Sequence, residues 1–206
     1  MNVLVPDKLD VIHFEDFIAW YPEQSETCYE LHQGAIVAMP KPKGKHSEIA
    51  GFLIAELNFE IRRLGLSYVI PRECIVKCDD FSGYEPDVIV LDRNKLGSEP
   101  RWEAESTITQ GETVPIVIEV VSSNWSDDYA LKLDAYETLG IQEYWIVDYL
   151  GIGGRKFIGS PKQPTLSVYH LENGEYAVKQ YKKDQLMESL IFPEIRLSVS
   201  EIFTAC

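Results

Sequence analysis

Three residues in the middle of the chain have the types and spacing that phosphoester chemistry uses: Asp87, Glu119 and Lys132. Two carboxylates on neighbouring strands can hold one or two Mg²⁺ ions, which prefer oxygen ligands and complete their coordination with a phosphate. Such ions polarise a phosphodiester and lower the pKa of bound water. A nearby ammonium can orient that water or stabilise the charge of the transition state. The three residues therefore suit hydrolysis of a phosphoester.

The most informative of the three is Glu119, because it interrupts a run of apolar, mostly β-branched residues at 116–121. Such a run predicts a central strand that is covered on both faces. A carboxylate in a buried strand is costly unless it is paired, hydrogen-bonded, protonated or bound to a metal. Glu119 therefore needs a partner, and the alternative to a metal is a purely structural pairing of buried groups.

The elements that must position these residues follow from periodicity. A helix predicted at 127–139 ends at Gly140, as helices commonly do, and is followed by a strand at 143–149. One side of that helix carries a partly apolar set of residues: Asp128, Lys132, Ala135, Tyr136 and Leu139. Lys132 could instead form an ordinary surface pair with Asp128, four residues away. Pro86 can open a strand, which places Asp87 near the beginning of the strand that contains 88–91.

The remaining elements form a cover and a set of hairpins. A long helix is expected at 46–64, just before Gly65, and Tyr136, Tyr144 and Trp145 are read as core residues. Residues 93–114 show no helical or strand period and are predicted to form a long loop at the edge of the fold. Other predictions are a short helix at 13–20, hairpins at 27–39 and 166–181, strands at 67–70, 73–77 and 190–192, and a helix at 198–203.

Composition describes an ordinary globular protein. The 206 residues are 45% hydrophobic and 25% charged, which favours a single domain spanning 1–206. There is no run long enough to cross a bilayer and no signal peptide at the start, so we expect a cytoplasmic protein that does not bind membranes. A formal net charge of −14 argues against a general affinity for nucleic acid. The densest basic stretch is the loop KPKGKH at Lys41 to His46.

The chain resembles the Uma family of restriction endonucleases, a branch of the PD-(D/E)XK nuclease superfamily. The resemblance rests on the pairs Pro86-Asp87 and Glu119-Val120, on Ser122, Asp128, Lys132, Tyr136 and Gly140, and on the run EYWIVD at 143–148. It extends to the segment YELHQGAIVAMP, to His46 and to the segment YHLENGEY.

The resemblance implies an α/β (α+β) fold: a restriction-endonuclease-like mixed central sheet flanked by helices, with an αβββαβ core and extra hairpins. It also implies a Mg²⁺ or Mn²⁺ site in which Asp87 and Glu119 are the acids. The superfamily lysine expected two residues after Glu119 is Val121 here, and Lys132 on the helix matches it instead. Glu48 is the candidate for the acid that many members supply from the first helix.

Two functions remain open at this point. The first is a metal-dependent DNA endonuclease, with catalytic Asp87, Glu119, Lys132 and Glu48, and with nucleic-acid contacts from Lys41, Lys43, Lys45 and His46. A homodimer is expected, because cutting both strands of a duplex usually needs two active sites. The alternative is a catalytically silent binding or regulatory protein that keeps the nuclease fold. RNA is not excluded as the substrate.

Overall fold

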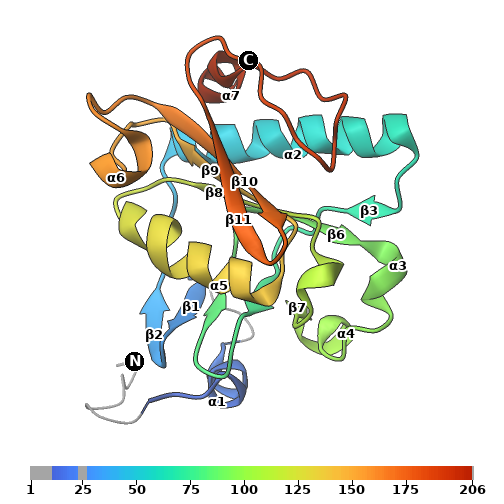
Figure 1. Cartoon of the computed structure of the whole chain (residues 1–206). Coiled ribbons are helices and arrows are strands. Elements are labelled where there is room, and N and C mark those ends of the chain that lie inside the picture. Colours follow the sequence, from blue (N-terminus) through green and yellow to red (C-terminus); the bar gives the residue numbers. More distant parts are fainter. Residues whose placement is uncertain (1–10, 23–26, 206) are drawn as a thin grey trace.

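The computed structural model describes residues 11–22 and 27–205, which form two β-sheets with helices packed around them (Figure 1). The larger sheet has six strands in the order β11-β10-β9-β8-β6-β3. Their bounds are β3 Tyr68–Val69, β6 Val88–Asp92, β8 Ile116–Val120, β9 Glu143–Asp148, β10 Thr165–Glu172 and β11 Glu175–Tyr181. β8 and β9 run parallel, whereas every other neighbouring pair is antiparallel, so the sheet is mixed.

This sheet is covered on both faces, as the apolar run around Glu119 predicts. On one face, helix α2 (Gly44–Leu64) packs its buried residues against alternate side chains of β6 and β8, including Val90 and Ile118. On the other face, helix α5 (Lys132–Leu139) packs against the intervening side chains, including Ile89 and Val117. The order α2, β3, β6, β8, α5, β9 is the expected αβββαβ core, and the predicted fold class is confirmed.

The second sheet has five strands in the order β2-β1-β5-β4-β7. It joins the hairpin predicted at 27–39 to the strand predicted at 73–77 and to two short strands that were not predicted. Their bounds are β1 Tyr29–His32, β2 Ala35–Ala38, β4 Ile75–Lys77, β5 Gly83–Tyr84 and β7 Thr107–Ile108. Helix α1 (Phe14–Trp20) buries Phe14 and Phe17 beside Leu31 of this sheet. The hairpins β1–β2 and β10–β11 both turn through two residues with positive φ, at 33–34 and 173–174.

Glycines end both flanking helices where predicted. Gly65 (φ 65°) follows α2, which begins two residues before its expected start, and Gly140 (φ 86°) follows α5.

The helix predicted at 127–139 is not uniform, because a π-helical turn at Asp127–Leu131 precedes the regular α-helix. Helices α6 (Arg155–Ile158) and α7 (Val199–Thr204) complete the chain. None of the helices in the described ranges has the length and apolar character that a membrane span requires.

Two of the predictions are wrong. Residues 93–114 are not an irregular loop: they contain α3 (Arg93–Leu96), α4 (Trp102–Glu105), β7 and a 3₁₀ turn at Gly111–Thr113. Side chains stabilise these short pieces, since Asp92 accepts a hydrogen bond from the backbone N–H of Asn94 and buried Glu99 accepts one from that of Thr109.

The strand predicted at 190–192 does not form either. The backbone N–H groups of Leu190 and Ile191 donate to the carboxylate of Glu143 instead of to a neighbouring strand. The carboxylate of Glu143 thus takes the place of the backbone carbonyl groups with which a strand would have paired.

Candidate active site

Asp87 and Glu119 lie at the same end of the central sheet. Asp87 immediately precedes β6, and Glu119 is on the adjacent strand β8. The two strands are antiparallel with Val88 paired to Ile118, so both acids are next to the last pair of the ladder. Burial raises the pKa of Glu119, and the nearby charge of Asp87 adds to this. The two acids lie between the start of α2 and the π-helical turn that precedes α5.

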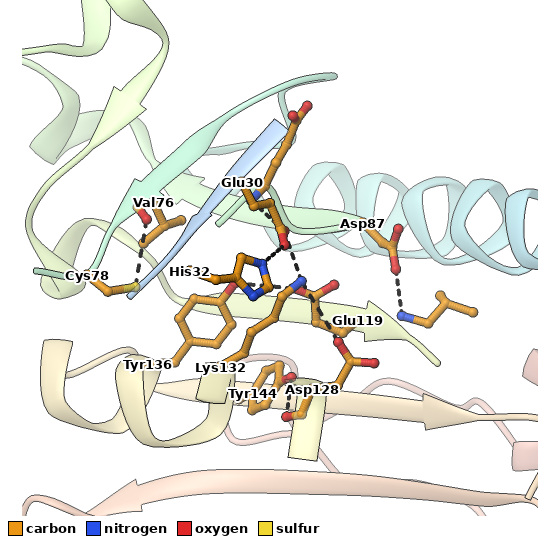
Figure 2. Close-up of polar contacts among 12 residues, drawn as sticks. Glu30, His32, Val76, Cys78, Asp87, Glu119, Asp128, Lys132, Tyr136 and Tyr144 are labelled. Carbon is orange, nitrogen blue, oxygen red and sulfur yellow. Dashed lines mark hydrogen bonds and ion pairs between the residues drawn. The ribbon is translucent and has the colours of Figure 1, made fainter. Parts of the chain in front are cut away.

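Glu119 is held through only one of its carboxylate oxygens. Lys132 Nζ donates to Glu119 Oε1 at 3.0 Å, and Tyr136 Oη donates to the same oxygen at 3.1 Å (Figure 2). Both donors come from α5 and are buried. Tyr136, expected only as a core residue, is therefore also a hydrogen-bond donor to the site. Among the described residues, nothing donates to the second oxygen, Oε2.

Asp87 is held in the same one-sided way. Its Oδ2 accepts a hydrogen bond of 2.8 Å from the backbone N–H of Val120 and lies 3.2 Å from His46 Nε2 on α2. Burial acts to lower the pKa of His46, but the hydrogen bond and the charge of Asp87 outweigh it, so the pKa is raised. Within the described chain, Asp87 Oδ1 has no hydrogen-bonding partner.

Lys132 is buried among three acids. Besides Glu119, its Nζ lies 3.0 Å from Glu30 Oε1 and 3.8 Å from Asp128 Oδ1. Burial acts to lower the pKa of Lys132, but the charges of Glu119, Glu30 and Asp128 raise it well above its usual value. The three acids therefore favour the charged form of the lysine, and the alternative of an exposed pair with Asp128 is wrong.

Glu30 is the residue of the site that sequence reasoning missed. It lies on β1 of the second sheet and is fully buried. The backbone N–H of Glu85 donates to its Oε1 at 3.0 Å, and His32 Nε2 lies 2.7 Å from its Oε2. In sequence it is one acid in a short half-polar strand, YELH, and only the pairing of distant strands places it beside Lys132.

The site carries more negative than positive charge. Burial, together with the charges of Asp87 and Asp128, raises the pKa of Glu119 well above its usual value, although Lys132 opposes this. Burial also raises the pKa of Asp128, to about 7. Glu30 differs, because Lys132 and His32 outweigh the effect of burial and lower its pKa. A cation bound beside Glu119 would relieve the excess of negative charge.

The donor set fits a magnesium or manganese ion held by few protein ligands. No cluster of three or more His, Cys, Asp or Glu side chains in the described ranges is arranged to hold a metal ion. Mg²⁺, however, is commonly bound through one or two carboxylates, keeps several waters and uses substrate phosphates. Asp87 Oδ1 and Glu119 Oε2 are the two oxygens that remain available for such an ion.

The other predicted site residues lie apart from this cluster or take other roles. Glu48 is exposed and pairs with Lys45 at 3.3 Å; two residues along α2 from His46, it points away from Asp87. Lys45 also donates to the backbone carbonyl of Thr204. His46 is buried against Asp87 rather than presented at the surface. Lys41 and Lys43 are exposed in the segment that leads into α2.

Two other buried acids, Glu143 and Asp148, differ from Glu119 in their hydrogen-bond partners. Glu143 accepts from the backbone N–H of Ile191 at 3.0 Å and from Trp145 Nε1 at 2.8 Å. Asp148 accepts from the N–H groups of Ile152 and Gly153 on its two oxygens. Within the described ranges, Glu119 has no backbone donor and leaves one oxygen without a partner, which distinguishes it from acids that only hold loops in place.

Comparison with known families shows which family the chain belongs to. The family model Uma2, described as "Putative restriction endonuclease", matches residues 14–200. The chain belongs to the Uma2 family. The match includes Asp87, Glu119 and Lys132, and membership of Uma2 supports a nuclease.

A solved structure shares the fold of this Uma2 protein. It is a crystal structure from Anabaena variabilis described as "a putative nuclease belonging to DUF820", with a TM-score of 0.70 and 21% sequence identity. The similarity covers 94% of this chain and 98% of the other. No curated protein sequence matches the chain.

Proposed function

We propose that this Uma2 protein is a Mg²⁺- or Mn²⁺-dependent endonuclease that hydrolyses phosphodiester bonds of DNA. The observation that carries the proposal is the pair of acids at the end of β6 and β8. Each acid has one oxygen fixed by protein donors and one oxygen left open, and a buried ammonium lies 3.0 Å from Glu119. These are the groups that metal-assisted phosphoester hydrolysis requires.

In this proposal, Asp87 and Glu119 would hold the metal ion, which supplies charge neutralisation at the scissile phosphate and acidifies a bound water. Lys132 donates hydrogen bonds from a position fixed by Glu119 and Glu30, where it can orient the attacking water or stabilise charge on the phosphate. His46 and the N–H of Val120 hold Asp87, while Tyr136 helps to hold Glu119.

The exposed ammonium groups of Lys41 and Lys43 are proposed to contact the phosphate backbone beside the site. They precede His46 on the same segment, and His46 reaches Asp87. Glu48 is left out of the catalytic set because it pairs with Lys45 at the surface.

Metal binding is the first test. Isothermal titration calorimetry with Mn²⁺ should show binding to the wild type that Glu119→Gln and Asp87→Asn abolish or weaken strongly. Asp134→Asn, which changes an exposed acid on the same helix as Lys132, serves as the matched control and should bind like the wild type. Absence of binding at millimolar Mn²⁺ would favour a silent nuclease-fold protein.

Cleavage is the second test. Supercoiled plasmid incubated with protein and Mg²⁺ or Mn²⁺ should be nicked or linearised by the wild type and by Asp134→Asn. Glu119→Gln and Lys132→Met should lose at least about 100-fold in rate, the scale expected when a transition-state donor is removed. Equal nicking by the wild type and Glu119→Gln would identify a contaminant and remove the proposal.

We further propose that residues 1–206 form one domain that acts as a cytoplasmic homodimer, since cutting both strands of a duplex calls for two sites. Light scattering should give about twice the monomer mass, and thermal unfolding should show one cooperative transition. A monomeric mass in the presence of duplex DNA would contradict the dimer.

A further inference from the structure

The longest stretch of this acidic chain without an Asp or Glu carries only positive charge. Between Asp148 and Glu172 there is no Asp or Glu, but there are three Lys or Arg residues: Arg155, Lys156 and Lys162. The formal net charge of the whole chain is −14, so a stretch of this length without an acid stands out. It includes helix α6 and the loop that follows it, residues 151–164, which we call the α6 segment.

The three cations of the α6 segment face solvent without a carboxylate partner. All three side chains are exposed. Within the described part of the chain, none of them forms an ion pair, whereas Lys45, Arg63, Lys77, Lys95, Arg101 and Lys179 each do. Lys162 donates to the backbone carbonyl of Ile152 at 2.9 Å, which orders the loop and leaves the positive charge unneutralised.

The α6 segment packs directly on the turn that carries Asp128 into the site. The ring of Phe157 stacks on that of Tyr129 with centroids 4.9 Å apart, and Lys162 Nζ lies 5.6 Å from the centre of the Trp125 ring. Figure 1 shows α6 beside the start of the helix that leads into α5. Lys132 follows Tyr129 by three residues, so this contact joins the α6 segment to the catalytic lysine's helix.

A second group of exposed cations lies near the same site. Lys41 and Lys43 lead into α2, whose His46 contacts Asp87. Helix α2 covers one face of the central sheet, whereas Phe157 and Ile158 of the α6 segment pack with α5 in the core on the other face. Positive charge on both sides of an otherwise acidic site is complementary to a phosphate backbone that crosses it.

We propose that the α6 segment is a second DNA-contacting surface, in which Arg155, Lys156 and Lys162 bind backbone phosphates on the side of the site away from α2. The inference rests on the proposed function and specifies how the substrate is held. Contacts to phosphate position a duplex without reading its sequence. The surface therefore supplies affinity and orientation, and sequence recognition belongs elsewhere on the protein.

The test is binding of a fluorescently labelled duplex of about 30 base pairs, measured by anisotropy in Ca²⁺ buffer that does not support cleavage. The variant R155A/K156A/K162A is compared with R62A/R93A/R196A, which removes the same charge from three exposed cations. In the described chain those three form no ion pairs either. Arg62 is at the far end of α2 from His46, and Arg93 follows the end of β6 away from Asp87.

We expect the α6 variant to bind at least 10-fold more weakly and the control variant to stay within about threefold of the wild type. The slope of log K against log salt should fall in magnitude by about 0.9 for each phosphate that the variant no longer neutralises. The double variant R155A/K156A, which keeps the hydrogen bond of Lys162, should show an intermediate weakening. The swap R155K/K156R should keep wild-type binding, and circular dichroism should be unchanged throughout.

Two outcomes overturn the inference: equal weakening by both triple variants, which reports only total charge, and no weakening by the α6 variant. Plasmid cleavage and DNA binding are measured separately, so failure of the nuclease proposal can be told apart from failure of this inference. If the α6 variant alone loses binding but the wild type cleaves no plasmid, the surface stands and the catalytic proposal falls. If Glu119→Gln binds DNA like the wild type and does not cleave, both proposals are supported.

Discussion

Lys132 Nζ on α5 lies 3.0 Å from Glu30 Oε1 on β1, so the two β-sheets are joined by an ion pair at the candidate active site. The same ammonium lies 3.0 Å from Glu119 Oε1 on β8 of the larger sheet. One lysine thus serves two glutamates that are 89 positions apart in the chain. Its position depends on the docking of the second sheet against the first, which gives the hairpins a role in the site.

Removing the lysine should affect stability as well as cleavage. In Lys132→Met, Glu119 and Glu30 lose their counterion in a buried position, and breaking a buried pair from one side typically costs about 3–5 kcal/mol. Urea unfolding in EDTA should show a loss of that order. Adding Glu119→Gln to Lys132→Met should recover part of the stability without recovering cleavage. A single variant as stable as the wild type would contradict the pairing.

Glu30 should act as a positioning residue. We expect Glu30→Gln to lower kcat about 10-fold, because Lys132 loses one of its two fixed partners, with KM for DNA and the Mn²⁺ affinity nearly unchanged. The split between kcat and metal affinity is the informative readout, since a merely structural role would move only the free energy of unfolding. His32→Gln, which alters the other oxygen of Glu30, should show a smaller effect in the same direction.

His46 should tune the metal affinity through Asp87. Groups that hydrogen-bond a metal-ligating carboxylate typically change metal affinity about 10- to 100-fold when removed. Calorimetry should therefore show His46→Ala binding Mn²⁺ more weakly by that factor, with Asp134→Asn unchanged. A substitution that keeps a donor, His46→Gln, should recover part of the loss. Wild-type affinity in His46→Ala would show that the 3.2 Å contact does not hold Asp87 for a metal.

The raised pKa of Asp128 predicts a pH-dependent stability in the absence of metal. Burial raises this pKa to about 7; Lys132 acts to lower it, and Asp87, Glu30 and Asp127 raise it further. Between about pH 4 and 7 the folded state thus keeps a proton that the unfolded state has lost, so the free energy of unfolding falls as pH rises.

Urea unfolding in EDTA at pH 5 and pH 8 measures this fall. It should be larger for the wild type than for Asp128→Asn by on the order of 2 kcal/mol. Identical falls in the two proteins would mean that Asp128 does not titrate in this range.

Glu143 provides the opposite case of a buried acid that stabilises the fold without taking part in chemistry. Its carboxylate accepts hydrogen bonds from Trp145, Ser189, Leu190 and Ile191. Glu143→Ala should lower the free energy of unfolding by about 3 kcal/mol or more, because several buried donors lose their acceptor. Mn²⁺ affinity of the folded variant should equal that of the wild type, and a selective loss of metal binding would contradict this division of roles.

Much of the larger sheet and its two flanking helices could be predicted from local patterns. The helices before Gly65 and Gly140 have strong apolar periodicity, and Glu119 is conspicuous because it is the one acid in a β-branched run. Local patterns fail where a side chain from elsewhere decides the outcome. The apolar run at 190–192 has the composition of a strand, but the backbone N–H groups of Leu190 and Ile191 donate to Glu143 instead of to another strand. Glu30 looks like an ordinary acid on a strand in the sequence, and only the pairing of β1 with β5 brings it to the site.

The same limit applies to the short elements at 93–114. Each has too few residues to show a hydrophobic period. They are stabilised by side-chain hydrogen bonds to Asp92 and Glu99 that cannot be read from the local sequence pattern. The π-helical turn at Asp127–Leu131 is another example, since nothing in the composition of DDYAL separates it from a regular α-helix.

That π-helical turn has a consequence for how the protein can be inactivated. A π turn contains one residue more than the α-helical turn it replaces, so deleting exposed Ala130 should restore regular spacing. Residues inside the turn, including Asp128 and Tyr129, would change direction relative to Lys132, because a π turn takes up more residues than an α turn. Tyr129 and the ammonium could then no longer both reach their partners. The number of residues between Asp128 and Lys132 therefore helps to position the candidate site, and we expect a one-residue deletion to abolish the proposed activity while leaving every proposed catalytic side chain in the chain.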